Sequence, residues 1–322
     1  MMGVLNHLST LLLLSLLPPA LSHVVKKFSD VPQCKNFFMQ GTTPNLPGIL
    51  VDGTVQNQNR YKPICQLFND TYRFATLYDT TNRIPVFSAY TFTGPPMGPR
   101  PNQPWMIEPQ LNMENNNHEM QVDHSYQAVN YDYNNSIPSK GVNRGHLFPS
   151  SHAHDNDTQT STFTLTNIVP QVVSFNDGSW KKMEENVRKK LEKDCINNNG
   201  NIEAYVVTGA VPSKRNTLKY EVNIPDLLWT AYCCYNSEKN EWMAKAHWGS
   251  NKKVKTKTLK TETLGALEKM LYNKLKRHHY PGGDVQVFPD QCRGGSSQKE
   301  REKSREREVG SGDVSGKRVN GM

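Results

Sequence analysis

The sequence predicts one α+β domain, and three observations support this class. Short segments rich in β-branched and aromatic residues recur between turn residues, which is typical of strands. Two longer segments instead repeat apolar residues every three or four positions, which is typical of amphipathic helices. Residues 23–292 show no break in composition, and the chain of 322 residues is long enough to bury a sizeable core. Strands interleaved with a few helices indicate the α+β class.

The chain begins with a segment that is typical of an export signal. Residues 11–17 form an apolar run that is too short to cross a bilayer. Ala20 and Ser22 then provide the small residues of a signal-peptidase site. We therefore expect residues 1–22 to be a cleaved signal peptide and the mature protein to be secreted and extracellular, without a membrane anchor. Three glycosylation sequons agree with export: Asn69, Asn134 and Asn156.

All six cysteines follow this segment: Cys34, Cys65, Cys195, Cys233, Cys234 and Cys292. An even number in an exported chain predicts three disulfides. Cys34 and Cys65 both lie in the N-terminal part, which favours their pairing. Cys233 and Cys234 would point to opposite faces of a strand, so we expect them to have different partners. The pairing of the last four cysteines stays open.

Five segments have strand patterns, which in chain order are residues 71–78, 84–93, 203–209, 227–235 and 242–248. The third is continuously apolar, like a buried strand, and ends in a glycine turn. The last two are expected to form a hairpin around residues 236–240. Helical patterns occupy residues 179–194 and 261–277. From Arg293 onward the chain is rich in glycine, serine and charged residues, so we expect residues 293–322 to be a disordered, mildly basic tail.

Charge and one short segment point to a function. The 38 Lys and Arg residues against 30 Asp and Glu residues favour an acidic partner such as nucleic acid. Phosphodiester hydrolysis needs a base for the attacking water and positive charge for the phosphate and the leaving oxygen. His146 suits the first task, and Arg144 with a hard divalent cation suits the second. Asn176 and Glu184 lie about two helical turns apart and can face the same side.

Local sequence supports a strand–strand–helix metal site, with His146 on a strand that packs on the helix. Gly145 permits either a close approach of the backbone or a positive φ. The segment that begins at Asn176 resembles a helix start, with Asp177 or Ser179 as the N-cap. This arrangement would place Asn176 just before the positive end of the helix dipole.

Three blocks resemble the DNA/RNA non-specific endonuclease family, which has a ββα-metal (His-Me finger) fold. They are Arg144-Gly145-His146, Thr166-Asn167-Ile168-Val169-Pro170-Gln171 and Asn176-x-Gly178-x-Trp180-x-x-x-Glu184. Their order and spacing match the family, and the resemblance covers residues 55–285. It implies a central, mostly antiparallel sheet flanked by helices. The N-terminal segment, the cysteines and the length make the chain most similar to secreted vertebrate members.

The resemblance implies a role for each matched residue. His146 is similar to the general base that activates water. Asn176 is similar to the single protein ligand of Mg²⁺, for which Mn²⁺ is an alternative. Glu184 is similar to a carboxylate that orients metal-bound water and assists the leaving group. Arg144 is similar to an arginine that contacts the phosphate, and Asn167 to an asparagine that supports the site near the scissile phosphate.

Two positions qualify this match. The family has a second, upstream arginine, for which Arg100 is the candidate and Arg83 the competitor. The family usually has Asp directly before Arg-Gly-His, where this chain has Asn143. An asparagine keeps an acceptor oxygen but removes a negative charge, so we expect weaker metal binding, slower cleavage or both.

We therefore expect a secreted, Mg²⁺-dependent endonuclease that cuts DNA and/or RNA with little sequence specificity, because phosphate contacts carry no sequence information. The alternative, which Asn143 favours, is a catalytically weak or inactive homologue that binds nucleic acid or protein. A serine hydrolase that pairs His146 with Ser150 or Ser151 is disfavoured, because the Gly-x-Ser-x-Gly elbow is missing. Around His152 and His154 we expect a solvated loop rather than a second metal site.

Overall fold

The computed structural model describes residues 24–111, 126–253, 258–277 and 283–293. The expected signal peptide and all but the first residue of the expected tail lie outside these residues. Within the described part of the chain, no helix combines the length and apolar character that crossing a membrane requires.

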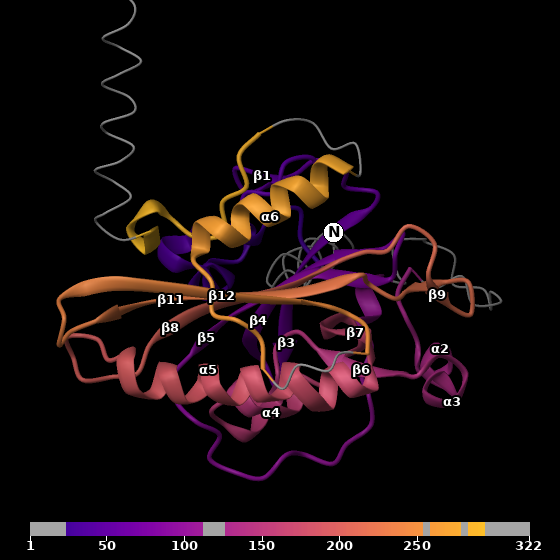
Figure 1. Cartoon of the computed structure of the whole chain (residues 1–322), viewed down its shortest axis with the longest axis horizontal. Coiled ribbons are helices and arrows are strands. Elements are labelled where there is room, and N and C mark those ends of the chain that lie inside the picture. The colour runs from indigo at the N-terminus through magenta and orange to yellow at the C-terminus, as the bar shows by residue number, and fades with distance from the viewer. Residues whose placement is uncertain (1–23, 112–125, 254–257, 278–282, 294–322) are drawn as a thin grey trace, which may run out of the picture.

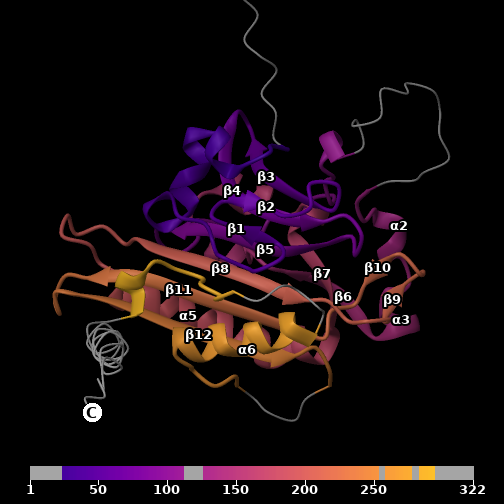
Figure 2. The same ribbon diagram turned by 90° about the horizontal axis from the view of Figure 1, so that it is seen from above.

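A six-stranded antiparallel sheet forms the centre of the fold, in the order β12-β11-β8-β5-β4-β3 (Figures 1 and 2). The strands are β3 (Tyr61–Phe68), β4 (Thr71–Asp79), β5 (Ile84–Phe92), β8 (Ala204–Val211), β11 (Leu227–Asn236) and β12 (Glu241–Ser250). The five predicted strands are confirmed, including the hairpin of β11 and β12. The edge strand β3 is an addition to the prediction.

One helix covers each face of this sheet (Figure 1). Helix α5 (Lys181–Asp194) buries Met183, Val187 and Leu191 against one face, and α6 (Leu264–Arg277) buries Leu264, Leu267 and Leu271 against the other. Both predicted helices are confirmed, although each begins two or three residues later than predicted. The three layers follow from the alternation of side chains along each strand, since both faces of the sheet are apolar.

Three disulfides join these layers, and their pairing explains the adjacent cysteines. On β11, Cys233 belongs to the core beneath α6 and Cys234 to the core beneath α5. Cys233 accordingly bonds to Cys292, and Cys234 bonds to Cys195 at the end of α5. The prediction of separate partners for the two cysteines is thereby confirmed.

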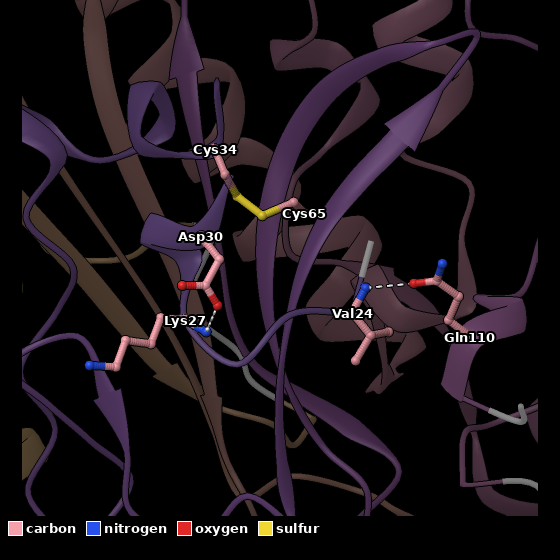
Figure 3. Close-up of a disulfide and its surroundings, with 6 residues drawn as sticks. All are labelled: Val24, Lys27, Asp30, Cys34, Cys65 and Gln110. Carbon is pink, nitrogen blue, oxygen red and sulfur yellow. Dashed lines mark hydrogen bonds between the residues drawn. A yellow bond between two sulfur atoms is a disulfide. The ribbon is translucent and has the colours of Figure 1, made fainter. Parts of the chain in front are cut away.

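The third disulfide, Cys34–Cys65, confirms the predicted N-terminal pair and ties a 3-10 segment to β3 (Figure 3). Nearby, the backbone N–H of Lys27 donates to Asp30 Oδ2 at 2.9 Å, and that of Val24 donates to Gln110 Oε1 at 2.8 Å. The 3-10 segments are η1 (Phe28–Asp30), η2 (Pro32–Phe37) and η3 (Met39–Gly41). Their buried side chains join the core on the α6 side of the sheet.

Shorter elements surround the sheet. A second, two-stranded sheet contains β6 (Val142–His146) and β7 (Ile168–Val172). The other short strands are β1 (Leu50–Val51), β2 (Thr54–Val55), β9 (Thr217–Leu218) and β10 (Val222–Asn223). The short helices are α2 (Asn130–Tyr133), α3 (Ser136–Lys140) and α4 (Asn156–Ser161). The remaining helical turns are η4 (Pro109–Leu111), η5 (Ser150–His152), η6 (Leu165–Asn167), η7 (Phe175–Trp180) and η8 (Asp290–Arg293).

Candidate active site

Strands β6 and β7 and the start of α5 form a strand–strand–helix unit. His146 is the last residue of β6 and pairs with Ile168, the first residue of β7. After β7 the chain enters η7, which is a π-helical turn, and continues directly into α5. Asn176 lies in this turn and Glu184 in the first turn of α5. The expected ββα arrangement is therefore present.

A cavity of about 360 Å³ lies beside this unit. Five of the six predicted site residues line it: Arg100, Arg144, His146, Asn176 and Glu184. Further lining residues are Asn143, Ser150, Ser151, Gln159, Asp177 and Lys181. Among the described residues, no hydrogen bond joins the hydroxyl of Ser150 or Ser151 to His146, so the cavity lacks the contact that a serine nucleophile needs.

Two aromatic rings hold the His146 imidazole. The ring centroids of Trp105 and Phe163 each lie 5.2 Å from that of His146, and the Phe163 ring is nearly perpendicular to it. His146 Nε2 is buried and has no hydrogen-bond partner within the described residues. Burial, together with the positive charge of Arg100, lowers the pKa of His146 to about 3. The imidazole is therefore neutral at pH 7, which is the form that a general base requires.

Each cavity arginine is held by aromatic faces. The guanidinium carbon of Arg100 lies 5.1 Å from the Phe163 ring centroid. That of Arg144 lies 5.6 Å from the centroid of Trp105 and 5.1 Å from that of Tyr133. Neither arginine forms an ion pair within the described parts of the chain. Cation–π contacts fix the guanidinium groups without neutralising them, so their charges remain available to an anionic ligand.

Asn143 orients the predicted metal ligand. Its Oδ1 accepts a hydrogen bond of 2.7 Å from Nδ2 of Asn176. Because the amide nitrogen of Asn176 is engaged in this bond, its Oδ1 is the atom that remains for a cation. The position where the family usually has Asp thus contacts the proposed ligand directly.

Glu184 combines a partly buried carboxyl with cationic neighbours. Burial raises its pKa to about 8, while Arg100 and Lys181 favour the charged form. The first turn of α5 is fixed by His152, whose Nε2 forms a 3.0 Å hydrogen bond with the backbone oxygen of Glu184. His152 Nδ1 in turn forms a 2.8 Å hydrogen bond with the hydroxyl of Tyr90 on β5. Hydrogen bonds through His152 and Tyr90 therefore connect the backbone of Glu184 to the central sheet.

This support corrects the expectation of a solvated loop at His152, which is only 3% exposed. The nearby Asp155 and Asp157 are also tied down, because both form ion pairs with Arg73. The described residues contain no group of three or more His, Cys, Asp or Glu side chains placed to hold a metal. The segment around His152 acts as structural scaffolding.

The two remaining site predictions fall outside the cavity lining. Asn167 is fully buried and braces the chain after His146: its Oδ1 accepts from Ser88 Oγ and the Phe148 N–H, and its Nδ2 donates to Phe148 O and Thr162 O. Arg83 instead forms an ion pair with Glu221 in the β9–β10 hairpin. The structure thus brings Arg100, rather than Arg83, to His146.

The start of α5 differs from the expected cap. The backbone passes through η7 with a kink at Gly178, where φ is −103° and ψ is −110°. The N-cap of η7 is Ser174, and no side-chain hydrogen bond caps it. The expectation of Asp177 or Ser179 as N-cap is therefore wrong. A π turn accommodates an extra residue, and such turns are frequent at functional sites.

Three of the six cations of α5 pair with acids of the same helix. Lys182 pairs with Glu185, Arg188 with Glu192, and Lys190 with Asp194. Lys181 is the cation of this helix that lines the cavity. The place of Lys181 in the cavity favours a phosphate contact for this residue, whereas Lys182, Arg188 and Lys190 are engaged by acids of their own helix.

Position 145 requires glycine because the Gln171 side chain lies too close to leave room for a Cβ. A Cβ at this position would lie 2.1 Å from Oε1 and 2.6 Å from Cβ of the fully buried Gln171. We expect Gly145→Ala to lower the free energy of unfolding by about 1–3 kcal/mol, as overpacking does. Gly265 on α6 has open space around its Cβ position, so Gly265→Ala should stabilise by about 0.5–1 kcal/mol. Urea unfolding of both variants measures the difference; equal stabilities would contradict the close approach.

Known proteins resemble the chain at the level of sequence. A family model described as DNA/RNA non-specific endonuclease matches residues 54–278. The endonuclease domain-containing 1 protein of Homo sapiens is 34% identical over 213 residues, which are 63% of this chain and 39% of that protein. The Mus musculus protein of the same name is 33% identical over 213 residues, 63% of this chain and 38% of that protein. The chain thus spans about two fifths of the length of these curated relatives.

Among solved structures, a chain from the crystal structure of the EndoG/EndoGI complex aligns with a TM-score of 0.45 and 18% sequence identity. The alignment covers 63% of this chain and 83% of that chain.

Proposed function

Because the chain belongs to the DNA/RNA non-specific endonuclease family, we propose that it is a secreted, Mg²⁺-dependent endonuclease that hydrolyses phosphodiester bonds in DNA and/or RNA with little sequence specificity. The observation that carries the proposal is the convergence of His146, Asn176, Glu184 and two arginines, which form no ion pair among the described residues, on one cavity. The confirmed match to the family and to vertebrate relatives supports it.

The oxygen donors of the cavity suit a hard cation. Mg²⁺ uses few protein ligands and keeps several waters, so one amide oxygen on Asn176 with Glu184 nearby fits it, and Mn²⁺ has similar preferences. The hydrogen bond from Asn176 Nδ2 to Asn143 leaves Oδ1 of Asn176 available to coordinate a cation. When bound, Mg²⁺ supplies positive charge for the phosphate and the leaving oxygen.

The residues of the chain divide the remaining work. The neutral His146 takes the proton of the attacking water, and the two aromatic rings hold it in one orientation. Arg100 and Arg144 bind the phosphate and stabilise the charge that develops on it. The Glu184 carboxylate orients water in the cavity. Because these groups are assigned to phosphate, water and metal rather than to base edges, we expect low sequence specificity.

Plasmid DNA and RNA incubated with the purified mature chain test the proposal, with Mg²⁺, with Mn²⁺ or with chelator. Cleavage that requires the metal is the expected result. If nucleic acid binds but stays intact at every metal concentration, the chain is the inactive binding module that the missing charge at Asn143 favours. If it neither binds nor cuts, the nuclease proposal fails.

Asn143→Asp is expected to strengthen metal binding. A carboxylate accepts the hydrogen bond from Asn176 more strongly than an amide does and adds a negative charge beside the ligand. Changes of such outer partners shift metal affinity about 10–100-fold, so we expect half-maximal cleavage at about one tenth of the wild-type Mg²⁺ concentration. An unchanged Mg²⁺ titration would show that the lost charge does not limit this site.

The pH profile of cleavage should reflect Glu184. Burial raises its pKa to about 8, so its charged form, and with it activity, increases as the pH rises towards 8. A bound dication favours the carboxylate, so a higher Mg²⁺ concentration should move the midpoint of this rise to lower pH. Glu184→Gln should remove the rise and leave a slower, flatter profile. Initial rates between pH 5.5 and 9 at two Mg²⁺ concentrations measure both effects; a rise that persists in Glu184→Gln would assign it to another group.

A further inference from the structure

The β9–β10 hairpin ends in an unusual turn. The backbone N–H of Glu221 donates to Leu218 O at 2.9 Å, and the two central residues, Lys219 and Tyr220, have φ values of 45° and 66°. Two left-handed central residues define a type I′ turn, for which Asn and Gly are strongly preferred. The Tyr220 side chain is 98% exposed. The turn therefore holds two poorly suited residues, one of which displays an aromatic ring to solvent.

Lys219 joins this turn to a second exposed ring. Its Nζ lies 3.2 Å from the ring centroid of Tyr131 on α2 and donates a hydrogen bond to the backbone oxygen of the same residue. The Tyr131 side chain is 69% exposed. We call these three residues, Tyr131, Lys219 and Tyr220, the aromatic ledge.

The aromatic ledge adjoins the candidate active site. Asn130, the residue before Tyr131, accepts a 3.2 Å hydrogen bond on its Oδ1 from Nη2 of Arg144, which lines the cavity. Figures 1 and 2 both show β9 and α2 at the end of the molecule where β6 and β7 lie. One contact chain thus links the cavity arginine to the exposed rings.

Contacts with neighbouring segments hold the hairpin in place, so its tip has a defined position. Glu221 forms an ion pair with Arg83. At the base, the Asn223 N–H donates to Asn82 O at 2.9 Å, and Asn223 Nδ2 donates to Ser213 O at 2.9 Å. Glu221 is thus engaged by Arg83, and within the described residues Lys219 forms no ion pair beside the Tyr131 ring.

We propose that the aromatic ledge binds an unpaired nucleotide of the substrate strand, beyond the nucleotides that lie in the cavity. This inference rests on the proposed nuclease function. Exposed aromatic rings can stack on any base, and a neighbouring cation can form an electrostatic contact with the phosphate. Two further exposed cations, Lys214 and Arg215, precede the hairpin. Of the nearby acids, Glu221 pairs with Arg83 and Asp132 is buried. The ledge therefore complements a single strand, whereas a duplex keeps its bases stacked inside.

The turn itself allows a clean test. Lys219→Asn with Tyr220→Gly removes both side chains and installs the residues that a type I′ turn prefers. The fold should be as stable as the parent or more stable, measured by thermal unfolding. Both proteins carry His146→Ala so that bound substrate stays intact. Fluorescence anisotropy then gives the dissociation constants for labelled oligothymidylates in chelator.

We expect the double variant to bind an oligothymidylate of about 12 nucleotides about tenfold more weakly than its parent, since stacking on one ring contributes at about this level. Its affinity for a trinucleotide, which would occupy the cavity without extending to the ledge, should be unchanged. A duplex of the same length should lose less than the single strand. Tyr220→Trp should retain the affinity, and Tyr272→Ser, which changes an exposed ring on α6, should have no effect.

Two outcomes would contradict the ledge inference and leave the nuclease proposal unaffected. Plasmid cleavage by the unmodified chain tests the nuclease proposal separately. The first is equal affinity of the double variant and its parent for the longer oligonucleotide. The second is an equal loss for the trinucleotide, which would place the defect in the cavity. If the His146→Ala parent binds no oligonucleotide, the ledge inference falls as well, whatever the plasmid shows.

Discussion

His146→Ala is expected to reduce cleavage of plasmid DNA and RNA by about a hundredfold to ten-thousandfold, the usual contribution of a general base. The loss should fall on the turnover rate rather than on substrate binding, because the arginines that would hold the phosphate remain. The fold should persist, since His146 Nε2 makes no hydrogen bond that the substitution would break. Steady-state rates together with circular dichroism measure both.

His154→Ala is the matched control, because His154 lies outside the cavity lining and hydrogen-bonds the backbone oxygen of Pro95. It should cleave at the rate of the unmodified chain. If His146→Ala kept full activity, another group would have to be the base. If it lost activity by unfolding, the circular dichroism spectrum would reveal this.

Asn176→Ala is expected to have a comparable effect through the metal. Loss of outer partners alone changes metal affinity about 10–100-fold, so loss of the proposed ligand should weaken Mg²⁺ binding by at least about 100-fold. Cleavage at limiting Mg²⁺ should fall in proportion and recover in part at high concentrations. Mg²⁺ should also raise the melting temperature of the unmodified chain and not that of Asn176→Ala, because a ligand that binds the folded state stabilises it.

Asn176→Asp provides the control for this prediction. A carboxylate oxygen replaces the amide oxygen, so metal binding should persist or strengthen. The substitution removes the donor that bonds to Asn143, and a half-turn of the Asn143 amide would let its Nδ2 donate to the new carboxylate instead. An equal Mg²⁺ dependence in the unmodified chain and in Asn176→Ala would show that the ligand lies elsewhere.

Periodic patterns predicted the central sheet and its two covering helices except for one strand, and this exception has a physical cause. Strand β3 contains Pro63, which reads as a break in a strand because proline has no N–H to donate. The structure places β3 at the edge of the sheet, where proline is tolerated. The helices were predicted two or three residues too long at their starts, since apolar spacing does not locate caps.

The sequence predicted only those residues of the candidate site whose spacing along the chain indicated that they lie together. The separations of His146, Asn176 and Glu184 along the sequence, which match the family pattern, predicted that these residues share one site. All three line the cavity. Trp105 and Phe163 had no such signal, because lone aromatic residues in loops look like ordinary core. Their role depends on a tertiary arrangement that brings three distant segments together around one imidazole.

The paired disulfides of β11 have a consequence for where this chemistry could operate. Each disulfide contributes about 2–4 kcal/mol, and the total stability of a domain is about 5–15 kcal/mol. Three of them therefore account for a large share of what keeps the layers together. In the reducing cytosol the same chain would lose these links and much of its folded population. Under the proposed nuclease function, molecules that fail to form these disulfides would unfold in the cytosol and would not cleave the nucleic acids there.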